Sequence, residues 1–187
     1  MVYTIIVCIM AYIGTNIDDM FINMLLFSSA RSKKEDFAIV LGKYIGTGAL
    51  VALSVLGGIG LQTIVGNYAK FLGIIPILLG AKRIFDNIKG GNDTDDISVK
   101  SGFILSTIAV TIASGADNIG VYVPLFADFM PAQLLIMAVV FIVMTAVWCA
   151  LGKSLTNLPA VKSTIERYRH IITPAVYICL GLYILIF

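Results

Sequence analysis

The sequence contains few charged residues and few of the residues that build reactive centres. Only 13% of its 187 residues are charged, and there is a single histidine. Its mean hydropathy is +0.97, far above that of an ordinary water-soluble domain. The composition therefore excludes a soluble enzyme, and we expect no enzyme activity. A formal net charge of +2 also excludes a nucleic-acid-binding surface.

Cysteine is scarce as well. Cys8, Cys149 and Cys179 lie in three separate apolar segments, without a CxxC motif or a Cys/His cluster. This spacing excludes a zinc hydrolase site and a dithiol redox centre. We expect the three thiols to be small buried side chains, and we expect no resident cofactor.

Long apolar segments are abundant instead. A membrane-spanning helix needs about 20 apolar residues, and six segments are close to that length or longer. They cover residues 3–28, 37–61, 68–86, 102–126, 132–152 and 171–187. The sequence therefore predicts an all-α integral membrane protein with six transmembrane helices in the lipid bilayer, and it leaves no room for a soluble domain.

The positive charges predict the orientation in the membrane. With six spans, the connections after the first, third and fifth spans share one side, and with their flanks they hold eleven Lys and Arg residues. The opposite side holds only Lys70. Because positive residues stay in the cytoplasm, both termini are predicted to face outside a bacterial cytoplasmic (inner) membrane. Lys43 lies within the second span, and we expect it to snorkel towards the cytoplasm.

A polar stretch divides the chain into two similar halves. Residues 89–100 have the composition of a linker, and residues 1–88 and 101–187 each contain three of the expected spans. Three is an odd number, so the second half enters the membrane from the opposite side. The arrangement predicted is a pair of inverted three-helix repeats, as in many secondary transporters.

The first helices of the two halves align around polar residues. Residues 15–27 align without gaps on residues 114–126, which places Asp18 on Asp117 and Asp19 on Asn118. An acidic residue at the centre of a membrane helix costs about 2.5 to 3.5 kcal/mol. Acids at matching depths therefore indicate function, although pairing with Lys43 for packing alone is an alternative.

The neighbours of these acids supply further oxygen atoms. The candidate ligands are Thr15, Asn16, Asp18, Asp19 and Asn23 in the first half and Ser114, Asp117, Asn118 and Tyr122 in the second. Carboxylate, amide and hydroxyl oxygens favour a cation, and a divalent metal ion neutralises two charges at once. The set predicts a cation site between the halves.

Glycine and proline near the acids predict interrupted helices. Gly14 precedes the first polar stripe, and Gly115, Gly120 and Pro124 surround the second. Unwound helices would offer carbonyl ligands, with Gly115 and Pro124 acting in gating. A GxxxG motif in the second span predicts a close helix contact there. Lys43 would act in coupling if it paired with an acid in the empty state, but we favour an interfacial position for it.

The segments TNIDDMFIN (15–23) and SGADNIGVYVPLF (114–126) resemble the cadmium resistance transporter family of the CadD type, a branch of the lysine exporter superfamily. The resemblance covers essentially the whole chain. It implies a bacterial inner-membrane efflux protein for Cd2+, with Zn2+ or other divalent ions as further substrates, energised by the proton gradient. The acidic motifs of the family fall on Asp18, Asp19, Asp117 and Asn118, and this chain has Lys43 where a glutamine is frequent.

The expected mechanism is alternating access, in which the midplane acids bind the metal ion from the cytoplasm and protons replace it outside. Oxygen ligands discriminate poorly among divalent ions, so export of Mn2+ or Ca2+ is an alternative. Export of a cationic amino acid or a quaternary amine is another, with Tyr12, Phe21 and Tyr122 as the aromatic residues near the stripe. An intramembrane aspartyl protease or a purely structural subunit is less favoured, and the size of the chain is compatible with a homodimer.

Overall fold

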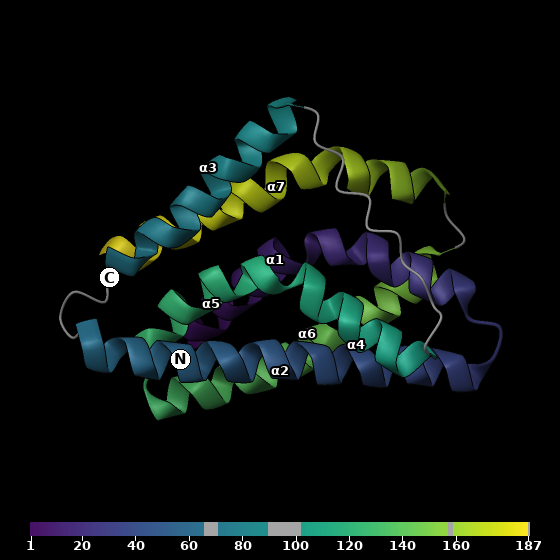
Figure 1. Ribbon diagram of the computed structural model, residues 1–187, viewed down its shortest axis with the longest axis horizontal. Helices are drawn as coiled ribbons and strands as arrows, with labels where there is room; N and C mark the ends of the chain where they lie inside the picture. The colour runs from purple at the N-terminus through teal and green to yellow at the C-terminus, as the bar shows by residue number, and fades with distance from the viewer. Residues whose placement is uncertain (66–70, 90–101, 157–158, 187) are drawn as a thin grey trace.

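The computed structural model describes residues 1–65, 71–89, 102–156 and 159–186. These residues form helices and no strands, as predicted (Figure 1). The helices are α1 (Val2–Ser29), α2 (Lys33–Val65), α3 (Ile74–Lys89), α4 (Phe103–Ser114), α5 (Ala116–Ala127), α6 (Pro131–Leu155) and α7 (Pro159–Ile186). Apart from Lys89, at the end of α3, the predicted linker falls outside the described residues.

Three helices, α1, α2 and α6, are long and apolar enough to cross a membrane. A fourth candidate span is formed by α4 and α5 together, which meet at an angle of 64°. Two further apolar helical segments are shorter: Phe71–Lys82, which ends within α3, and Ile171–Ile186 of α7. The described residues thus contain three or four candidate spans, and the count of six stays a prediction.

The side chains are distributed as in a protein whose solvent is lipid. On α6, Leu135, Val139 and Ile142 are each more than half exposed, whereas Thr145 and Trp148 are buried. A water-soluble protein rarely exposes such a continuous apolar surface. With the apolar helices, this distribution indicates a multi-pass membrane protein.

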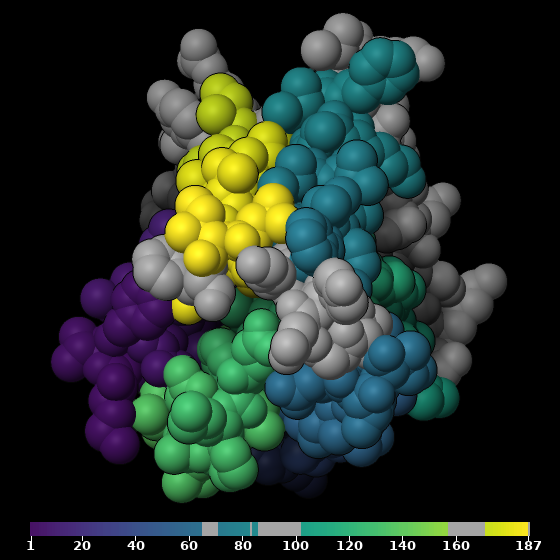
Figure 2. Space-filling view, turned by 90° about the vertical axis from the view of Figure 1, so that its left-hand side faces the viewer, coloured from purple at the N-terminus to yellow at the C-terminus, as the bar shows by residue number. Residues whose placement is uncertain are grey.

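The helices form two groups. In Figure 1, α3 and α7 lie side by side, apart from α2, α4 and α6, and α1 and α5 lie between the two groups. Figure 2 shows α3 and α7 from another side, with α7 in yellow next to α3 in teal. The helix α1 packs on α6 and on α7, and α2 packs on α4 and α5.

Glycines allow α3 and α7 to approach closely, and the contact is reciprocal. A Cβ atom on Gly80 of α3 would lie 2.9 Å from Cγ1 of Ile178 on α7. A Cβ atom on Gly181 of α7 would lie 2.6 Å from Cγ1 of Ile77 on α3. Each helix therefore presents a glycine to an isoleucine of the other.

The GxxxG motif of α2 makes the close contact that the sequence predicts. Cβ atoms on Gly42 and Gly46 would lie 2.7 and 2.8 Å from the Cβ atoms of Thr107 and Thr111 on α4. Such small residues let two backbones approach within a membrane.

The predicted interruption of the first helix is wrong. The helix α1 runs without a break through Gly14, where a Cβ atom would lie 2.1 Å from Cγ1 of Val176 on α7. Gly14 therefore allows α1 and α7 to pack together. The second interruption is confirmed, because α4 ends at Ser114 and α5 starts at Ala116. Gly120 and Pro124 lie within α5.

Candidate cation site

The polar stripe on α1 faces the interior of the bundle. Asn16, Asp19 and Asn23 occupy positions i, i+3 and i+7 of the helix, and their exposed fractions are 3%, 2% and 0%. This spacing places them on one face. Thr15 is also buried, at 4%, whereas Asp18 points to another side and is half-buried.

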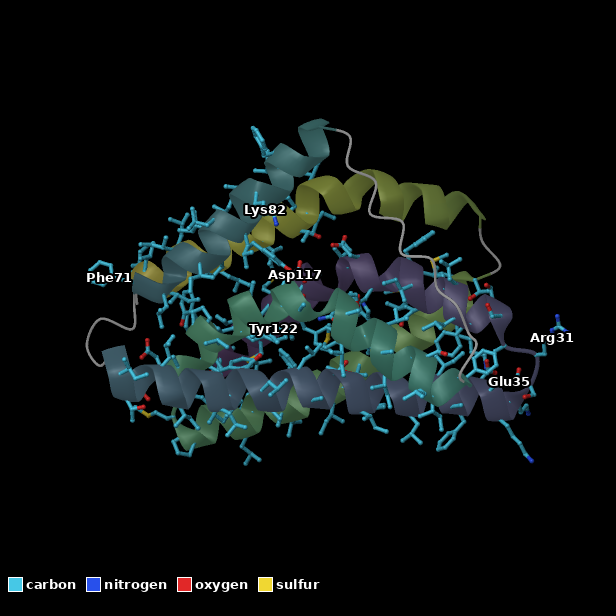
Figure 3. The ribbon with its side chains drawn as sticks, viewed as in Figure 1. Arg31, Glu35, Phe71, Lys82, Asp117 and Tyr122 are labelled. Carbon is cyan, nitrogen blue, oxygen red and sulfur yellow. The ribbon has the colours of Figure 1, made fainter. Side chains whose placement is uncertain are left out.

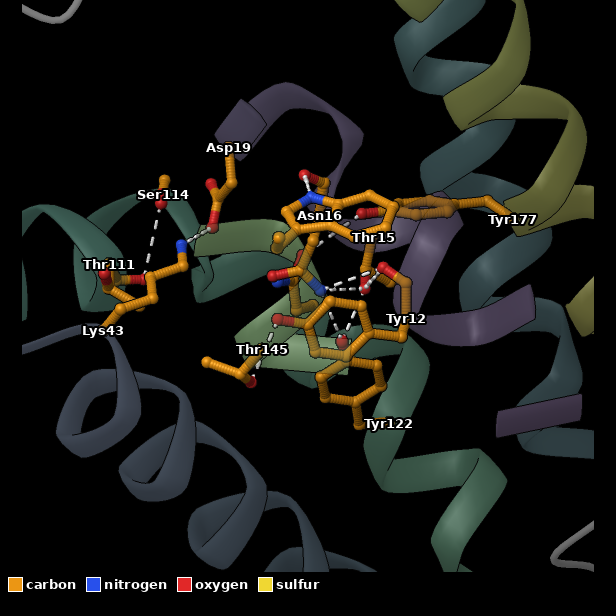
Figure 4. A network of polar contacts seen from close by, with 12 residues as sticks. Tyr12, Thr15, Asn16, Asp19, Lys43, Thr111, Ser114, Tyr122, Thr145 and Tyr177 are labelled. Carbon is orange, nitrogen blue, oxygen red and sulfur yellow. Dashed lines mark hydrogen bonds and ion pairs between the residues drawn. The ribbon is translucent and has the colours of Figure 1, made fainter. Parts of the chain in front are cut away.

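Asp19 forms a buried ion pair with Lys43 of α2. The Nζ atom of Lys43 lies 2.5 Å from Oδ2 of Asp19, and the two side chains are 1% and 3% exposed (Figure 4). The interfacial position favoured for Lys43 is therefore wrong. Lys43 lies ten residues into α2, or about 15 Å from its start at 1.5 Å per residue. Its ammonium group therefore pairs with the carboxylate of Asp19 inside the bundle.

Thr15 and Asn16 bind a residue of the other half. The amide Nδ2 of Asn16 donates to the hydroxyl of Tyr122 on α5 over 3.0 Å, and to Oγ1 of Thr15 over 2.9 Å. Thr15 and Tyr122 also share a hydrogen bond between their hydroxyl groups. These three predicted residues thus connect α1 to α5.

Residues of α6, which the sequence analysis did not select, hold α1 in place. Trp148 donates its Nε1 hydrogen to the carbonyl oxygen of Asn16 over 2.7 Å, and the hydroxyl of Tyr12 donates to Oγ1 of Thr145 over 3.1 Å. The sequence contains a feature that could have identified these residues. Tyr12 lies one turn before Asn16, and Thr145 and Trp148 stand within an apolar segment. Only the register between the helices makes them partners.

In the second half, the acidic residue lies at the start of a helix. Asp117 is in the first turn of α5, two residues after Gly115, and it is half-buried. The positive end of the helix dipole stabilises a carboxylate there. The hydroxyl of Tyr177 on α7 donates to Oδ2 of Asp117 and to Oδ1 of Asn118, over 3.4 Å in each case. Asn118 is buried, at 2%.

The remaining predicted residues are distributed around these contacts. Figure 3 shows Asp117 on the side of α5 that faces α3 and α7, and Tyr122 further along α5. Ser114 is half-buried, and its hydroxyl donates to the carbonyl oxygen of Thr111 over 3.4 Å. Pro124 is buried within α5. The predicted residues thus form three local groups, which are Asp19 with Lys43, Thr15 and Asn16 with Tyr122, and Asp117 and Asn118 with Tyr177.

The three predicted carboxylates do not form one group in this conformation. Within the described part of the chain, no three His, Cys, Asp or Glu side chains lie close enough to hold a metal ion together. Asp19 instead contacts an ammonium group, and Asp117 contacts Tyr177. The ligand set therefore stays a prediction.

The buried carboxylate of Asp19 is electrostatically paired in this structure. A carboxylate in the core of an apolar bundle requires a counter-charge, since an unpaired buried charge is costly. The ammonium group of Lys43 provides that charge from within the chain.

Together, the apolar helices and the charged residues buried among them define a multi-pass membrane protein of the transporter type. The family model described as cadmium resistance transporter matches residues 12–187, and the chain belongs to that family. Comparisons with curated proteins and with solved structures found no match.

Proposed function

We propose that the protein exports a divalent heavy-metal cation from the bacterial cytoplasm, with Cd2+ as the main substrate and Zn2+ as a further one. The family supports metal efflux. The observation that carries the proposal is the buried pair of Asp19 and Lys43, since a carboxylate neutralised by a movable side-chain cation can exchange that cation for a metal ion. In this proposal Asp18 and Asp117 supply the further negative charge.

The helix contacts support two inverted repeats, 1–88 and 101–187, with six spans in total. In the two repeats, α1 corresponds to α4 and α5 together, and α2 corresponds to α6. The contact of α1 with α6 is therefore equivalent to the contact of α4 and α5 with α2, and both contacts are present. When residues 77–80 of α3 are aligned on residues 178–181 of α7, Ile77 corresponds to Ile178 and Gly80 to Gly181, so the two reciprocal contacts between α3 and α7 are equivalent. Such reciprocity is expected around a two-fold axis.

Alternating access follows from this symmetry. One repeat rocks against the other, and the site between them opens to each side in turn. The contacts of Thr15 and Asn16 with Tyr122 must break during this motion, because they join the two repeats. The bend at Gly115 and the proline at position 124 make α4 and α5 the moving parts of the gate.

Protons provide the coupling in this mechanism. The metal ion displaces Lys43 from Asp19 when the site is open to the cytoplasm. On the outer side, two protons replace the ion on the carboxylates, so that exchange is nearly electroneutral. An opposing proton gradient therefore drives export.

Cellular accumulation of Cd2+ tests the proposed function. A sensitive bacterium would express the wild type, Asp117→Asn, or the control Asp128→Asn, at matched membrane levels. Asp128 is a suitable control because it is exposed at the end of α5. We expect low Cd2+ accumulation in the wild type and the control, and accumulation equal to the empty vector in Asp117→Asn.

Parallel measurements with Zn2+, Mn2+ and Ca2+ rank the ions. If wild-type cells accumulate every metal as the empty vector does, the proposed function is wrong. Cationic amino acids and quaternary amines are then the substrates to test.

A further inference from the structure

Asn23 is a buried amide group without a partner. Its side chain is 0% exposed, and neither Nδ2 nor Oδ1 has a hydrogen-bond partner among the described residues. Buried polar groups in proteins almost always have one. Asn23 lies one turn after Asp19, and a Cβ atom on Gly152 of α6 would lie 2.7 Å from its Cβ atom. The amide therefore sits where α1 and α6 are in close contact.

The register between α1 and α6 places Cys149 at the height of the segment of α1 between Asn16 and Asn23. The two helices run in the same direction, since Asn16 contacts Trp148 and Asn23 contacts Gly152. Cys149 lies between Trp148 and Gly152 in the sequence, so it is level with the segment of α1 that carries Asp19.

The side chain of Cys149 is turned towards α1 and α2. It is 4% exposed and belongs to a buried cluster with Leu26 and Phe27 of α1 and Ile39 of α2. Burial in this apolar cluster opposes the negative charge of a thiolate, whereas the positive charge of Lys43 on α2 favours it.

We propose that Cys149 is a sulfur ligand of the transported ion and that, with Asp19 and Asn23, it selects thiophilic divalent cations. The inference rests on the proposed function and deepens it. Thiolate favours Cd2+ and Zn2+, whereas Mn2+ and Ca2+ favour oxygen ligands. A site with oxygen ligands alone would not make that distinction.

The charges balance when the ion binds. As the ion binds from the cytoplasm, the thiol of Cys149 and one further acid, Asp18 or Asp117, each release a proton there, and the two new negative charges neutralise one divalent cation. The ammonium group of Lys43 moves away from Asp19 and stays as the counter-charge of that carboxylate. On the outer side, the same two groups take up the two protons that replace the ion. Asn23 offers its Oδ1 atom as a neutral ligand.

The test compares two buried cysteines in the full-length protein reconstituted in liposomes. Cys149→Ser removes the proposed sulfur ligand, and Cys8→Ser is the matched control because Cys8 is 0% exposed and lies near the start of α1. Cd2+ flux is measured with and without competing Mn2+. The ultraviolet charge-transfer absorption of a Cd2+–thiolate bond gives a second readout, which does not depend on transport.

We expect Cys149→Ser to lose about 10-fold or more of the preference for Cd2+ over Mn2+, since even changes in the outer shell of a metal site cost 10- to 100-fold in affinity. Its charge-transfer band should be absent, whereas Cys8→Ser should match the wild type in both. Cys149→Ala gives the same readouts if a hydroxyl in this apolar position prevents folding.

Unchanged preference and an unchanged band in Cys149→Ser would overturn the inference, and the Cd2+ flux of the same preparations would leave the proposed function intact. Equal losses in Cys8→Ser would overturn it too. If the wild type moves no metal ion, the proposed function itself is wrong, and the inference with it.

Discussion

Asp19 in the first half and Asn118 in the second half occupy aligned positions, but only Asp19 carries a charge. Both residues are 2% exposed. Asp19 is charged and pairs with Lys43 of α2, whereas Asn118 is neutral and accepts a hydrogen bond from Tyr177. Residues 131–152 of α6 contain no charged residue that corresponds to Lys43. An acidic side chain thus occupies the core where the bundle provides a counter-charge, and an amide occupies it where the bundle does not.

Asp18 and Asp117, the other aligned pair, are both half-buried. The helix around Asp18 is continuous, whereas Asp117 lies in the first turn of a new helix after the bend at Gly115. The backbone therefore stabilises the charge in the second half through the helix dipole. In the first half, a side-chain cation stabilises the charge of the neighbouring Asp19.

Removal of Lys43 should have the largest effect on stability. Lys43→Met leaves the carboxylate of Asp19 buried and unpaired, which is expected to destabilise the protein by about 3 to 5 kcal/mol. Thermal unfolding in detergent micelles measures the loss. The double variant Lys43→Met/Asp19→Asn removes both charges and should recover most of the stability. Equal destabilisation in the single and double variants would contradict the pairing.

A carboxylate introduced at position 118 tests whether a buried charge in the second half is destabilising without a counter-charge. Asn118→Asp places a carboxylate where α6 offers no cation, and we expect destabilisation by about 2.5 to 3.5 kcal/mol. Asn118→Ala is the control, because it loses only the contact with Tyr177, worth about 1 kcal/mol. Unfolding temperatures of the two variants give the difference. An Asn118→Asp variant as stable as the wild type would show that the counter-charge rule does not hold.

The membrane class, the helical regions and the buried stripe of α1 were predictable because they depend on local composition and on helical periodicity. The close contact at Gly42 and Gly46 was predictable from a motif. The partner of Lys43 was not, since its distance to Asp19 depends on how α1 and α2 align in space. The contact of Asn23 with Gly152 depends in the same way on the register of α1 and α6.

A smaller effect is expected from the glycine that keeps the first helix close to α7. Gly14→Ala would place its methyl group against Val176, a stiff branched side chain, and should cost about 1 to 3 kcal/mol. Gly48→Ala on α2 is the control, because a Cβ atom there meets nothing within 4 Å. That variant should gain about 0.5 to 1 kcal/mol from helix propensity. If both alanines stabilise the protein, the packing at Gly14 is looser than described.

The smallest effect is expected at an exposed ion pair with the same chemistry as the buried one. The Nζ atom of Lys153 lies 2.7 Å from Oδ2 of Asp36, but the side chain of Lys153 is 56% exposed. Lys153→Ala should change stability by at most about 1 kcal/mol, because surface pairs contribute little. The unfolding temperature should decrease far less than in Lys43→Met. A loss equal to that of Lys43→Met would remove the distinction between buried and exposed pairs.

In the proposed mechanism, the transported cation binds where the buried pair of Asp19 and Lys43 lies. Cd2+ flux into proteoliposomes under an imposed pH gradient, compared between the wild type and Lys43→Met/Asp19→Asn, tests this position. We expect the double variant to fold like the wild type and its flux to fall to the level of empty liposomes. A double variant that carries Cd2+ at the wild-type rate would contradict it.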